Sequence, residues 1–380
     1  MLETLFWISA TAILYTYLGY PIAVWLLGNA RKLRIQKTSI TPSVSIVIAC
    51  HNEARNIDAR IRNIMACDYP AERVEIIVVS DGSTDRTVEI AQRHASGRVK
   101  VVSYYHRQGK ASALNIGVAH TTGEITLFAD ARQSFDSNVI KEIVANFGDS
   151  SVGAVSGELL LEGSRGASVG EGVGLYWRYE KWIRKSESRA GSVIGATGAI
   201  FAIRKELWRP LPEATILDDV YTPMRIALSG KLVVFEERAI ARDKTPESSA
   251  KEFKRKVRTL TGNYQLCQLM PRLLLPTSLL VLKFYSHKLM RLLAPIFFLL
   301  LLAASVMLVS RPEVQIIYQA ALVSQVTFYA GVLVAALFLK RNRRVPLLSF
   351  AYVFSLMNAA ALVGLFYFVI GKRNVWAREH

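Results

Sequence analysis

Two kinds of hydrophobic pattern divide the chain. Four runs are apolar over about 20 residues or more, which is long enough for a helix to cross a bilayer. They are Leu5–Leu27, Leu289–Val309, Ile316–Leu339 and Leu347–Ile370. Between the first and second runs the apolar stretches are short and alternate with polar segments. The pattern therefore predicts a membrane-anchored protein with one long polar region between its first two spans.

The polar region, from Thr41 to about Met270, predicts a soluble α/β domain. Four runs rich in β-branched residues are separated by stretches of helical period, which favours parallel strands joined by crossover helices. The runs are VSIVIAC (44–50), VEIIVVSD (74–81), VKVVSYY (99–105) and EITLFAD (124–130). In open sheets of this kind, ligands bind beyond the carboxyl ends of the strands.

Three regions follow from these patterns. Residues 1–40 are expected to form an anchor with a basic flank, residues 41–270 the soluble domain, and residues 271–380 an interfacial helix and further spans. The interfacial helix is expected over Leu273–Leu282, because this apolar segment is too short to cross a bilayer. The first span lacks a basic segment before it and a small-residue cleavage site, so a retained anchor is expected.

Basic flanks predict the orientation of the spans, because Lys and Arg collect on the cytoplasmic side. One cluster follows the first span and another the third: Arg31, Lys32, Arg34 and Lys37, then Lys340, Arg341, Arg343 and Arg344. Both are expected in the cytosol, together with the soluble domain. The same count puts Lys372 and Arg373 outside, so the side of the C-terminal tail stays open.

Composition agrees with a membrane protein. Of the 380 residues 51% are hydrophobic, although the formal net charge is +17. Apolar spans with basic flanks at an anionic lipid surface account for both values. Nucleic acid is not expected as a partner, since the basic residues crowd around apolar runs and are not interleaved with aromatic residues. The three cysteines show no disulfide or zinc spacing, which fits a reducing cytosol.

Polar or charged residues follow all four expected strands. The segments are CHNEARN (50–56), SDGSTDRT (80–87), YYHRQGKASALN (104–115) and DARQ (130–133). In the second, Ser83 or Thr84 is expected to cap a helix and Asp85 to suit its dipole, which leaves Asp81 without a local role. Lys110 either starts a solvated helix or contacts a ligand. The chain has no Walker loop and no GxGxxG, which argues against a P-loop NTPase and a dinucleotide dehydrogenase.

Five motifs, in order, resemble those of the inverting family 2 glycosyltransferases, in the membrane-anchored branch with hyaluronan, chitin and cellulose synthases. They are IVIACHNEARNI (46–57), VVSDGSTDRT (78–87), GKASALN (109–115), LFADARQ (127–133) and ILDDVYTPMRIALSGKLVVF (216–235). The resemblance implies a GT-A (Rossmann-like) nucleotide-sugar fold. It also implies these roles: Glu53 and Asp81 near the base and ribose, Lys110 near the diphosphate, Asp130 at the metal motif and Asp219 as the catalytic base.

Two further stretches resemble the family in part. GSVIGATGAIFAIRKELW (191–208) is similar to the glycine-rich loop on the acceptor side, where Gly198 would allow close backbone approach. Residues 255–259, RKVRT, take the place of the QxxRW motif. They keep the arginine, Arg258, but lack the glutamine and the tryptophan. A donor contact of Arg258 is expected, while the acceptor contact associated with the tryptophan is in doubt.

Sugar transfer also has chemical requirements that these residues meet. A carboxylate must take the proton of the acceptor hydroxyl, and cations must neutralise the leaving diphosphate. LDDV (217–220) supplies adjacent acids at the expected start of a helix over Val220–Ser229. We expect one acid, Asp218, on the acceptor side, to cap this helix and Asp219 to face the acceptor. The alternative is that both acids serve only the helix start.

The expected metal motif departs from its usual form. Arg132 stands where the family has a second acid, and a guanidinium cannot ligate a metal. Arg132 could pair with the diphosphate directly in place of the ion. Alternatively, Asp130 could hold Mg²⁺ or Mn²⁺ with the diphosphate oxygens, while Arg132 faces the acceptor or an acid such as Asp218. We expect the second arrangement.

The sequence thus predicts a membrane-bound inverting glycosyltransferase of the bacterial inner membrane, with its catalytic domain in the cytosol. Its expected partners are a nucleotide-sugar donor linked to UDP, a polysaccharide or lipid-linked acceptor, and membrane lipids. Processive and single-addition enzymes both stay open. The rival hypothesis is a catalytically inactive membrane scaffold or nucleotide-sugar sensor with the same fold, which the altered Asp130-Ala131-Arg132 motif favours and the retained Asp219 opposes.

Overall fold

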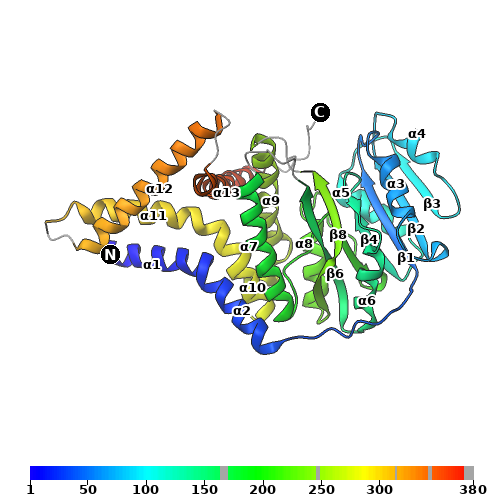
Figure 1. Cartoon of the computed structure of the whole chain (residues 1–380), viewed down its shortest axis with the longest axis horizontal. Helices are drawn as coiled ribbons and strands as arrows, with labels where there is room; N and C mark the ends of the chain where they lie inside the picture. The colour runs from blue at the N-terminus through cyan, green and yellow to red at the C-terminus, as the bar shows by residue number, and fades with distance from the viewer. Residues whose placement is uncertain (163–169, 245–248, 313–314, 341–344, 372–380) are drawn as a thin grey trace. The chain divides into compact units, whose positions relative to one another are not determined.

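The computed structural model describes residues 1–162, 170–244, 249–312, 315–340 and 345–371 (Figure 1). They fall into two compact units with interleaved sequences. The sheet unit consists of the described residues within 28–162 and 184–244, and the helix unit of those within 1–27, 163–183 and 245–375. The division differs from the expected boundaries, because parts of the region 41–270 group with the apolar helices.

The sheet unit contains eight strands in one sheet, in the order β3-β2-β1-β4-β7-β6-β8-β5. The strands are β1 (Val44–Cys50), β2 (Val74–Asp81), β3 (Val99–Tyr104), β4 (Ile125–Ala129), β5 (Ser134–Phe135), β6 (Val152–Glu162), β7 (Ile200–Arg204) and β8 (Leu232–Lys244).

The first four strands confirm the parallel strands expected from the sequence. β1 pairs in parallel with β2 and with β4, and β2 pairs in parallel with β3. Their carboxyl ends therefore meet at one edge of the sheet. Helices cross over between them, as the short α5 (Lys110–Ala119) does between β3 and β4. This half of the sheet gives the segments that follow the strands a common location.

The second half of the sheet is mixed. β7 runs antiparallel to β4 and to β6, whereas β6 and β8 are parallel. Phe128 of β4 lies opposite Phe201 of β7, and their rings stack with centroids 4.6 Å apart. Trp208 extends this contact, 5.4 Å from Phe128. Because such cross-strand aromatic pairs stabilise a sheet beyond their buried area, they help fix β7 beside β4.

The helices share their apolar faces with the sheet or with one another. They are α1 (Leu2–Leu14), α2 (Tyr20–Arg31), α3 (Ile57–Met65), α4 (Thr87–Gln92), α5, α6 (Val139–Ala145), α7 (Gly170–Arg189), α8 (Asp218–Leu228), α9 (Ser249–Leu269), α10 (Leu279–Phe284), α11 (Met290–Val309), α12 (Ile316–Lys340) and α13 (Pro346–Val369).

Within the helix unit, four helices are long and apolar enough to cross a bilayer: Leu2–Arg31, Leu279–Val309, Ile316–Leu339 and Leu348–Val369. They match the four expected spans in number and place. Leu273–Leu282, in contrast, is not a single helix. A 3₁₀ turn ends at Leu274, and a new helix begins at Leu279 and continues into the second span. Ser278 caps its start by accepting a hydrogen bond from the Val281 N–H, which explains why the helix begins there.

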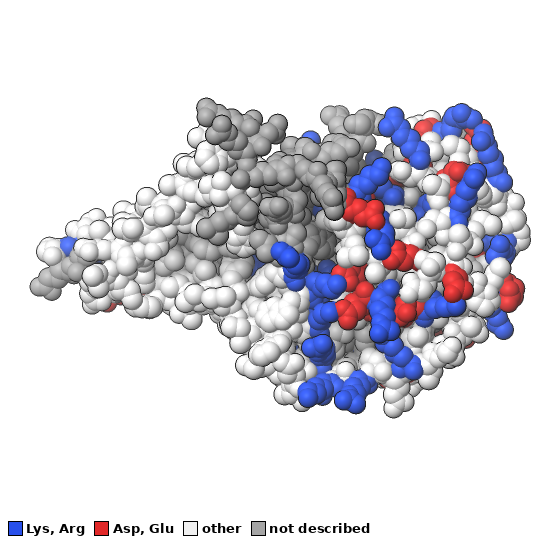
Figure 2. Space-filling model, in the orientation of Figure 1, with Lys and Arg blue, Asp and Glu red and all other residues white. Residues whose placement is uncertain are grey.

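Three of the long apolar helices differ from the sheet unit in surface charge. Figure 2 shows Lys, Arg, Asp and Glu side chains gathered over the sheet unit, whereas the parts of α1, α11 and α12 seen on this face are almost uncharged. Large apolar side chains are exposed along these helices, such as Leu14, Leu299 and Leu333. Long apolar helices with exposed side chains are typical of a membrane-associated protein.

The charges buried inside the helix unit are paired. Glu180 of α7 accepts hydrogen bonds from Arg291 of α11 and, at 3.2 Å, from His287 if that ring nitrogen carries the proton. Tyr179 donates from its hydroxyl to the Tyr17 carbonyl at 2.8 Å. Because an unpaired charge is costly away from water, these contacts help hold α7 among the apolar helices.

Candidate active site

The segment after β3 is shaped by Asp81, the last residue of β2. Its carboxylate accepts hydrogen bonds from the backbone N–H of Gln108 (2.6 Å) and Gly109 (2.9 Å) and from the Tyr104 hydroxyl (3.0 Å). Gly109, at φ 93°, is the residue before α5. Asp81 therefore anchors the loop whose end places Lys110 at the first position of α5. This gives Asp81 the local role that the sequence did not reveal.

The segments after β1 and β2, residues 50–56 and 81–87, form interlocked loops. The Asn52 N–H donates to the Ser83 hydroxyl at 3.1 Å, and the Ala54 N–H donates to the Asp85 carboxylate at 3.1 Å. The Asp85 carboxylate also accepts from the Thr87 N–H at 2.9 Å, at the start of α4. The expected cap at Ser83 or Thr84 is therefore wrong. Asp85 serves the helix, because the two hydroxyls are turned toward the neighbouring loop.

Glu53 lies within these interlocked loops and is half-buried. Its carboxylate accepts from the Asn56 side-chain amide at 2.6 Å, and its N–H donates to the Thr87 hydroxyl at 2.8 Å. These contacts hold Glu53 against the start of α4. A contact with the base or ribose stays a prediction.

A carboxylate–lysine cluster, consisting of Lys110, Asp130, Asp218 and Asp219, forms beyond the ends of β3 and β4. The Lys110 ammonium lies 3.1 Å from Asp130 Oδ1 and 3.5 Å from Asp218 Oδ2. Burial opposes the charge on Lys110, yet the carboxylates of Asp130, Asp218 and Asp219 outweigh it and raise the lysine pKa. The lysine is therefore a firmly protonated cation between acids.

Asp218 is the most buried acid of this cluster, with 5% of its surface exposed. Its Oδ2 makes no hydrogen bond to the described residues, although it faces the Lys110 ammonium. Burial raises the Asp218 pKa, and the nearby lysine opposes that rise. Asp218 does not cap α8, contrary to expectation. The cap residue is Leu217, and both acids lie in the first turn.

A proline explains how the start of α8 meets the glycine-rich loop. Pro223 has no N–H, so it leaves the Asp219 carbonyl without the donor that an α-helix normally supplies four residues on. That carbonyl accepts instead from the Ala196 N–H at 2.7 Å. The proline in the motif DDVYTP could have predicted that the Asp219 carbonyl bonds outside the helix, but the sequence analysis missed it.

Gly198 lies directly against the Asp219 side chain. A Cβ added at Gly198 would be 2.8 Å from Asp219 Oδ2, closer than real Cβ contacts. The glycine therefore gives the carboxylate its room, as expected for close backbone approach. Asp219 is half-buried whereas Asp218 is buried, so an incoming hydroxyl has better access to Asp219.

Arg132 is turned toward an acid that the sequence analysis did not consider. Its guanidinium pairs with the Asp243 carboxylate at 3.1 Å, near the end of β8. The expected turn toward an acid is observed, but the partner is Asp243 and not Asp218. The sequence feature that could have predicted this partner is the acid near the end of β8, in the segment AIARD.

The residues at the β4 end fit a divalent ion in part. Asp130 keeps 36% of its side chain exposed and offers carboxylate oxygens, which Mg²⁺ and Mn²⁺ prefer. Among the described residues, no group of three or more His, Cys, Asp or Glu could hold a metal alone. One carboxylate is sufficient where phosphate oxygens complete the shell. The site therefore fits an ion that arrives with a diphosphate.

Arg258 lies in α9, which belongs to the helix unit. The carboxylate–lysine cluster belongs to the sheet unit, so the donor contact of Arg258 stays a prediction. Of the sequence-predicted site residues, the structure brings five together: Lys110, Asp130, Gly198, Asp218 and Asp219.

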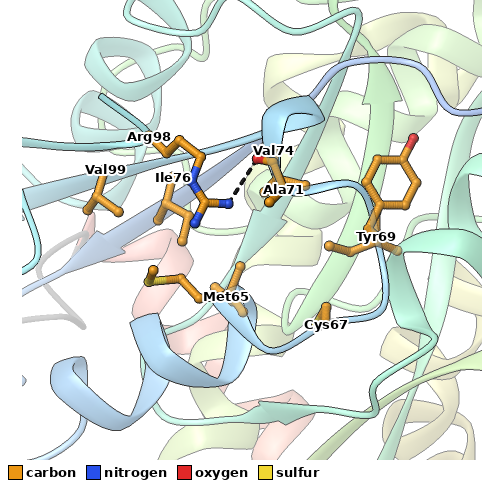
Figure 3. A pocket seen from close by; sticks show the side chains of 10 residues that line it. Met65, Cys67, Tyr69, Ala71, Val74, Ile76, Arg98 and Val99 are labelled. Atoms are coloured by element: carbon orange, nitrogen blue, oxygen red, sulfur yellow. Dashed lines mark hydrogen bonds between the residues drawn. The ribbon is translucent and has the colours of Figure 1, made fainter. Parts of the chain in front are cut away.

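A small hollow lies at the opposite edge of the sheet (Figure 3). Val74 and Val99, which begin β2 and β3, line it, and Arg98 donates to the Ala71 carbonyl at 2.9 Å beside it. Because it opens at the amino ends of these strands, it is separate from the cluster at their carboxyl ends.

The fold and the cluster together define a class of protein. A mixed sheet with acids and a lysine beyond its parallel carboxyl ends is the GT-A arrangement of glycosyltransferases. The mannosyltransferase PcManGT from Pyrobaculum calidifontis, solved in complex with GDP-Man and Mn²⁺, matches with a TM-score of 0.75. The match covers 98% of this chain and 100% of that chain at 21% identity. The expected GT-A fold is confirmed.

The family follows from the sequence comparison. Residues 45–210 match the family described as Glycosyl transferase family 2. These residues therefore carry a family 2 glycosyltransferase domain, as expected. The first four of the five motifs lie within the match, and the fifth, at 216–235, lies beyond it.

Curated relatives are polysaccharide synthases. The poly-beta-1,6-N-acetyl-D-glucosamine synthase of Staphylococcus aureus (strain COL) is 25% identical over 273 residues, which cover 66% of this chain and 65% of the relative. A synthase of the same name from Staphylococcus epidermidis is 23% identical over 269 residues, covering 69% and 63%. The chain thus spans just under two thirds of the length of these relatives.

Proposed function

We propose that this protein is a membrane-anchored, inverting glycosyltransferase that moves a sugar from a nucleotide donor to a glycan or lipid-linked acceptor. The observation that carries the proposal is the carboxylate–lysine cluster, in which a protonated lysine lies among three acids at the ligand-binding edge of a GT-A sheet. An inactive scaffold would have no need to keep a buried cation and a reachable carboxylate at this edge.

In this mechanism Asp219 is the general base. It takes the proton of the acceptor hydroxyl as the acceptor oxygen forms a bond to the anomeric carbon. The bond from that carbon to the donor diphosphate breaks on the opposite face, so the configuration inverts. Gly198 supports this assignment, since it leaves space at the Asp219 carboxylate. Asp218 is less suited, because it is buried against Lys110.

Lys110 is the cation that neutralises the leaving nucleoside diphosphate. Its ammonium is held at the cluster by Asp130 and Asp218, and Asp81 shapes the loop before it. A divalent ion bound at Asp130 would supply further positive charge to the same diphosphate. Such preorganised charge acts most strongly where water is excluded.

A nucleotide-sugar panel tests this function. Full-length protein in detergent is incubated with UDP- and GDP-linked sugars, because the curated relatives are named for N-acetylglucosamine polymers and the structural neighbour for GDP-mannose. Wild type is expected to release nucleoside diphosphate with at least one donor, to stop in EDTA and to recover with Mg²⁺ or Mn²⁺. Nucleotide-sugar binding without release from any donor, with or without added glycan or lipid, would favour the sensor hypothesis.

The membrane placement is also a proposal. Four helices suited to a bilayer and relatives that synthesise polysaccharide support an inner-membrane protein with a cytosolic sheet unit. Single cysteines at Arg34 and Arg343 should be shielded from an impermeant thiol reagent in intact cells. Labelling of either position from outside would reverse the orientation, and a cysteine at Arg378 would locate the tail.

A further inference from the structure

The segment after Asp130 is held from one side by Asp243. Three donors converge on its carboxylate: the Arg132 guanidinium at 3.1 Å, the Gln133 side-chain amide at 2.9 Å and the Lys244 N–H at 2.8 Å. Asp243 itself is only 7% exposed. A buried carboxylate with three donors is a well-satisfied anion, so this contact is a stable anchor for the loop.

The ion pair with Asp243 fixes the position of Arg132, whereas Asp243 is already fixed by burial. The Arg132 side chain is 58% exposed, whereas that of Asp243 is 4% exposed. Without the carboxylate, the arginine would be a long and flexible cation at the surface. Arg132 lies two residues after Asp130, and two residues span at most about 7 Å even when the backbone is fully extended. A released Arg132 could therefore swing to Asp130.

Such a swing would change what Asp130 can bind. Asp130 already has one cation beside it, the Lys110 ammonium at 3.1 Å. A second cation at the same carboxylate would compete for its oxygens and repel an approaching divalent ion, since like charges repel at such short range.

We infer that Asp243 is a positioning residue that holds Arg132 away from Asp130 and so keeps Asp130 open to a divalent ion bound with the donor diphosphate. The inference rests on the proposed function, because that function supplies the diphosphate. In this arrangement the arginine at the second position of the metal motif is compatible with metal binding only because the end of β8 brings an acid to it.

Mn²⁺ binding tests the inference without turnover. The electron paramagnetic resonance signal of free Mn²⁺ is titrated with full-length protein in detergent, in the presence of UDP and, separately, of GDP. Asp243→Asn is expected to weaken Mn²⁺ binding about 10- to 100-fold, the range for partners that orient a metal site. Removing the arginine as well, in Asp243→Asn with Arg132→Ala, should restore binding toward the wild-type level.

The matched control is Asp136→Asn. It removes the carboxylate that pairs with Arg242 at 2.6 Å, one residue before Asp243 on β8. Mn²⁺ binding should stay at the wild-type level in this variant. Circular dichroism checks that each variant folds. If Asp243→Asn does not fold, Asp243→Thr takes its place, because its hydroxyl can still accept from Gln133. It is then measured alone and together with Arg132→Ala.

Two results would overturn the inference: wild-type Mn²⁺ affinity in the folded Asp243 variant, or weak binding that persists after Arg132 is removed. Failure of the proposed function has a different outcome. In that case wild type binds Mn²⁺ with nucleotide, but releases no nucleoside diphosphate from any donor sugar.

Discussion

Asp81 ends β2 and Asp130 directly follows β4, two strands that flank β1 on opposite sides, yet the two acids have different surroundings. Asp81 is 4% exposed, and its carboxylate is filled by Tyr104, Gln108 and Gly109. Asp130 keeps 36% of its side chain exposed, and its carboxylate contacts the Lys110 ammonium at 3.1 Å. The Asp81 carboxylate is hydrogen-bonded to the protein's own backbone, whereas the Asp130 carboxylate is accessible to a ligand.

The difference shows that position at a strand end does not by itself make a binding residue. The loop that packs against the strand end decides how many carboxylate oxygens stay open to a ligand. At β2, the loop before α5 donates hydrogen bonds to both oxygens of Asp81, and these bonds fix the loop so that α5 starts at Lys110. Asp81 therefore contributes to the cluster through Lys110, and its contact with the ribose stays a prediction.

The largest effect is expected on the ligand side of this comparison, at Asp219. Asp219→Asn keeps the size of the side chain but removes the base, so turnover should fall by about 10²- to 10⁴-fold. Donor binding should be largely kept. Steady-state release of nucleoside diphosphate and equilibrium binding of the nucleotide separate these two effects. Wild-type turnover in the variant would show that another group takes the proton.

Lys110→Met sharpens the comparison next, because it removes the cation that Asp81 positions. Turnover should fall by about 10²- to 10³-fold, since one preorganised charge at the leaving group is lost. Lys100→Met is the matched control. Lys100 also pairs with a carboxylate, that of Glu75 at 3.0 Å, but near the other end of its strand. Equal losses in the two variants would contradict a specific role for Lys110.

Asp81→Asn tests the structural side. The amide supplies one acceptor where two oxygens now receive three donors, so a backbone N–H loses its partner. The free energy of unfolding should fall by about 1–3 kcal/mol. Thermal unfolding of the purified protein measures it, with the exposed pair variant Asp68→Asn as control. An unchanged melting temperature would mean that the loop does not depend on Asp81.

The smallest effect concerns Glu75, near the amino end of β2. Burial alone would raise its pKa, but hydrogen bonds from Ser45, Thr122 and Lys100 lower it from 4.5 to about 2. The folded state therefore binds this proton less readily than the unfolded state. The resulting stability is present above about pH 4.5 and is lost as the pH falls toward about 2.

Glu75→Gln should remove that part of the acid sensitivity. Melting temperatures measured from neutral pH down to about pH 3 should fall less steeply in Glu75→Gln than in wild type. Glu72→Gln is a suitable control, because Glu72 is an exposed acid in the turn just before β2. Identical slopes in wild type and Glu75→Gln would rule out this role for Glu75.

Several elements of this molecule could be predicted because their signals are local. Runs of β-branched residues gave the four parallel strands, and apolar length gave the four long helices. Motif order placed Lys110, Asp130 and Asp219 beyond the strand ends. Each of these signals lies within a window of a few to about 25 residues, where period and composition act directly on the backbone.

The mixed half of the sheet was not predicted, because the sequence of a strand does not indicate whether it pairs parallel or antiparallel to its neighbours. β7 lies antiparallel beside β4 because long-range contacts, such as the ring pair Phe128–Phe201, favour it there. The grouping of α9 with the apolar helices also depends on long-range contacts. Helix α9 has a charged, amphipathic sequence, but its contacts with α11 and α13 group it with the apolar helices. The Tyr264 hydroxyl donates to the Leu292 carbonyl at 3.2 Å, and the Thr261 hydroxyl donates to the Gly364 carbonyl at 3.3 Å.

By itself, the sequence determined the class of fold, the long apolar helices and the chemical types that meet at the site. The tertiary structure decided which partner each side chain takes. Asp218 faces Lys110 and leaves the helix cap to Leu217, while Arg132 pairs with Asp243, 111 positions along the chain. The physical reason is that a strand or helix forms from neighbouring residues, whereas an ion pair forms between whichever opposite charges the completed fold brings within reach.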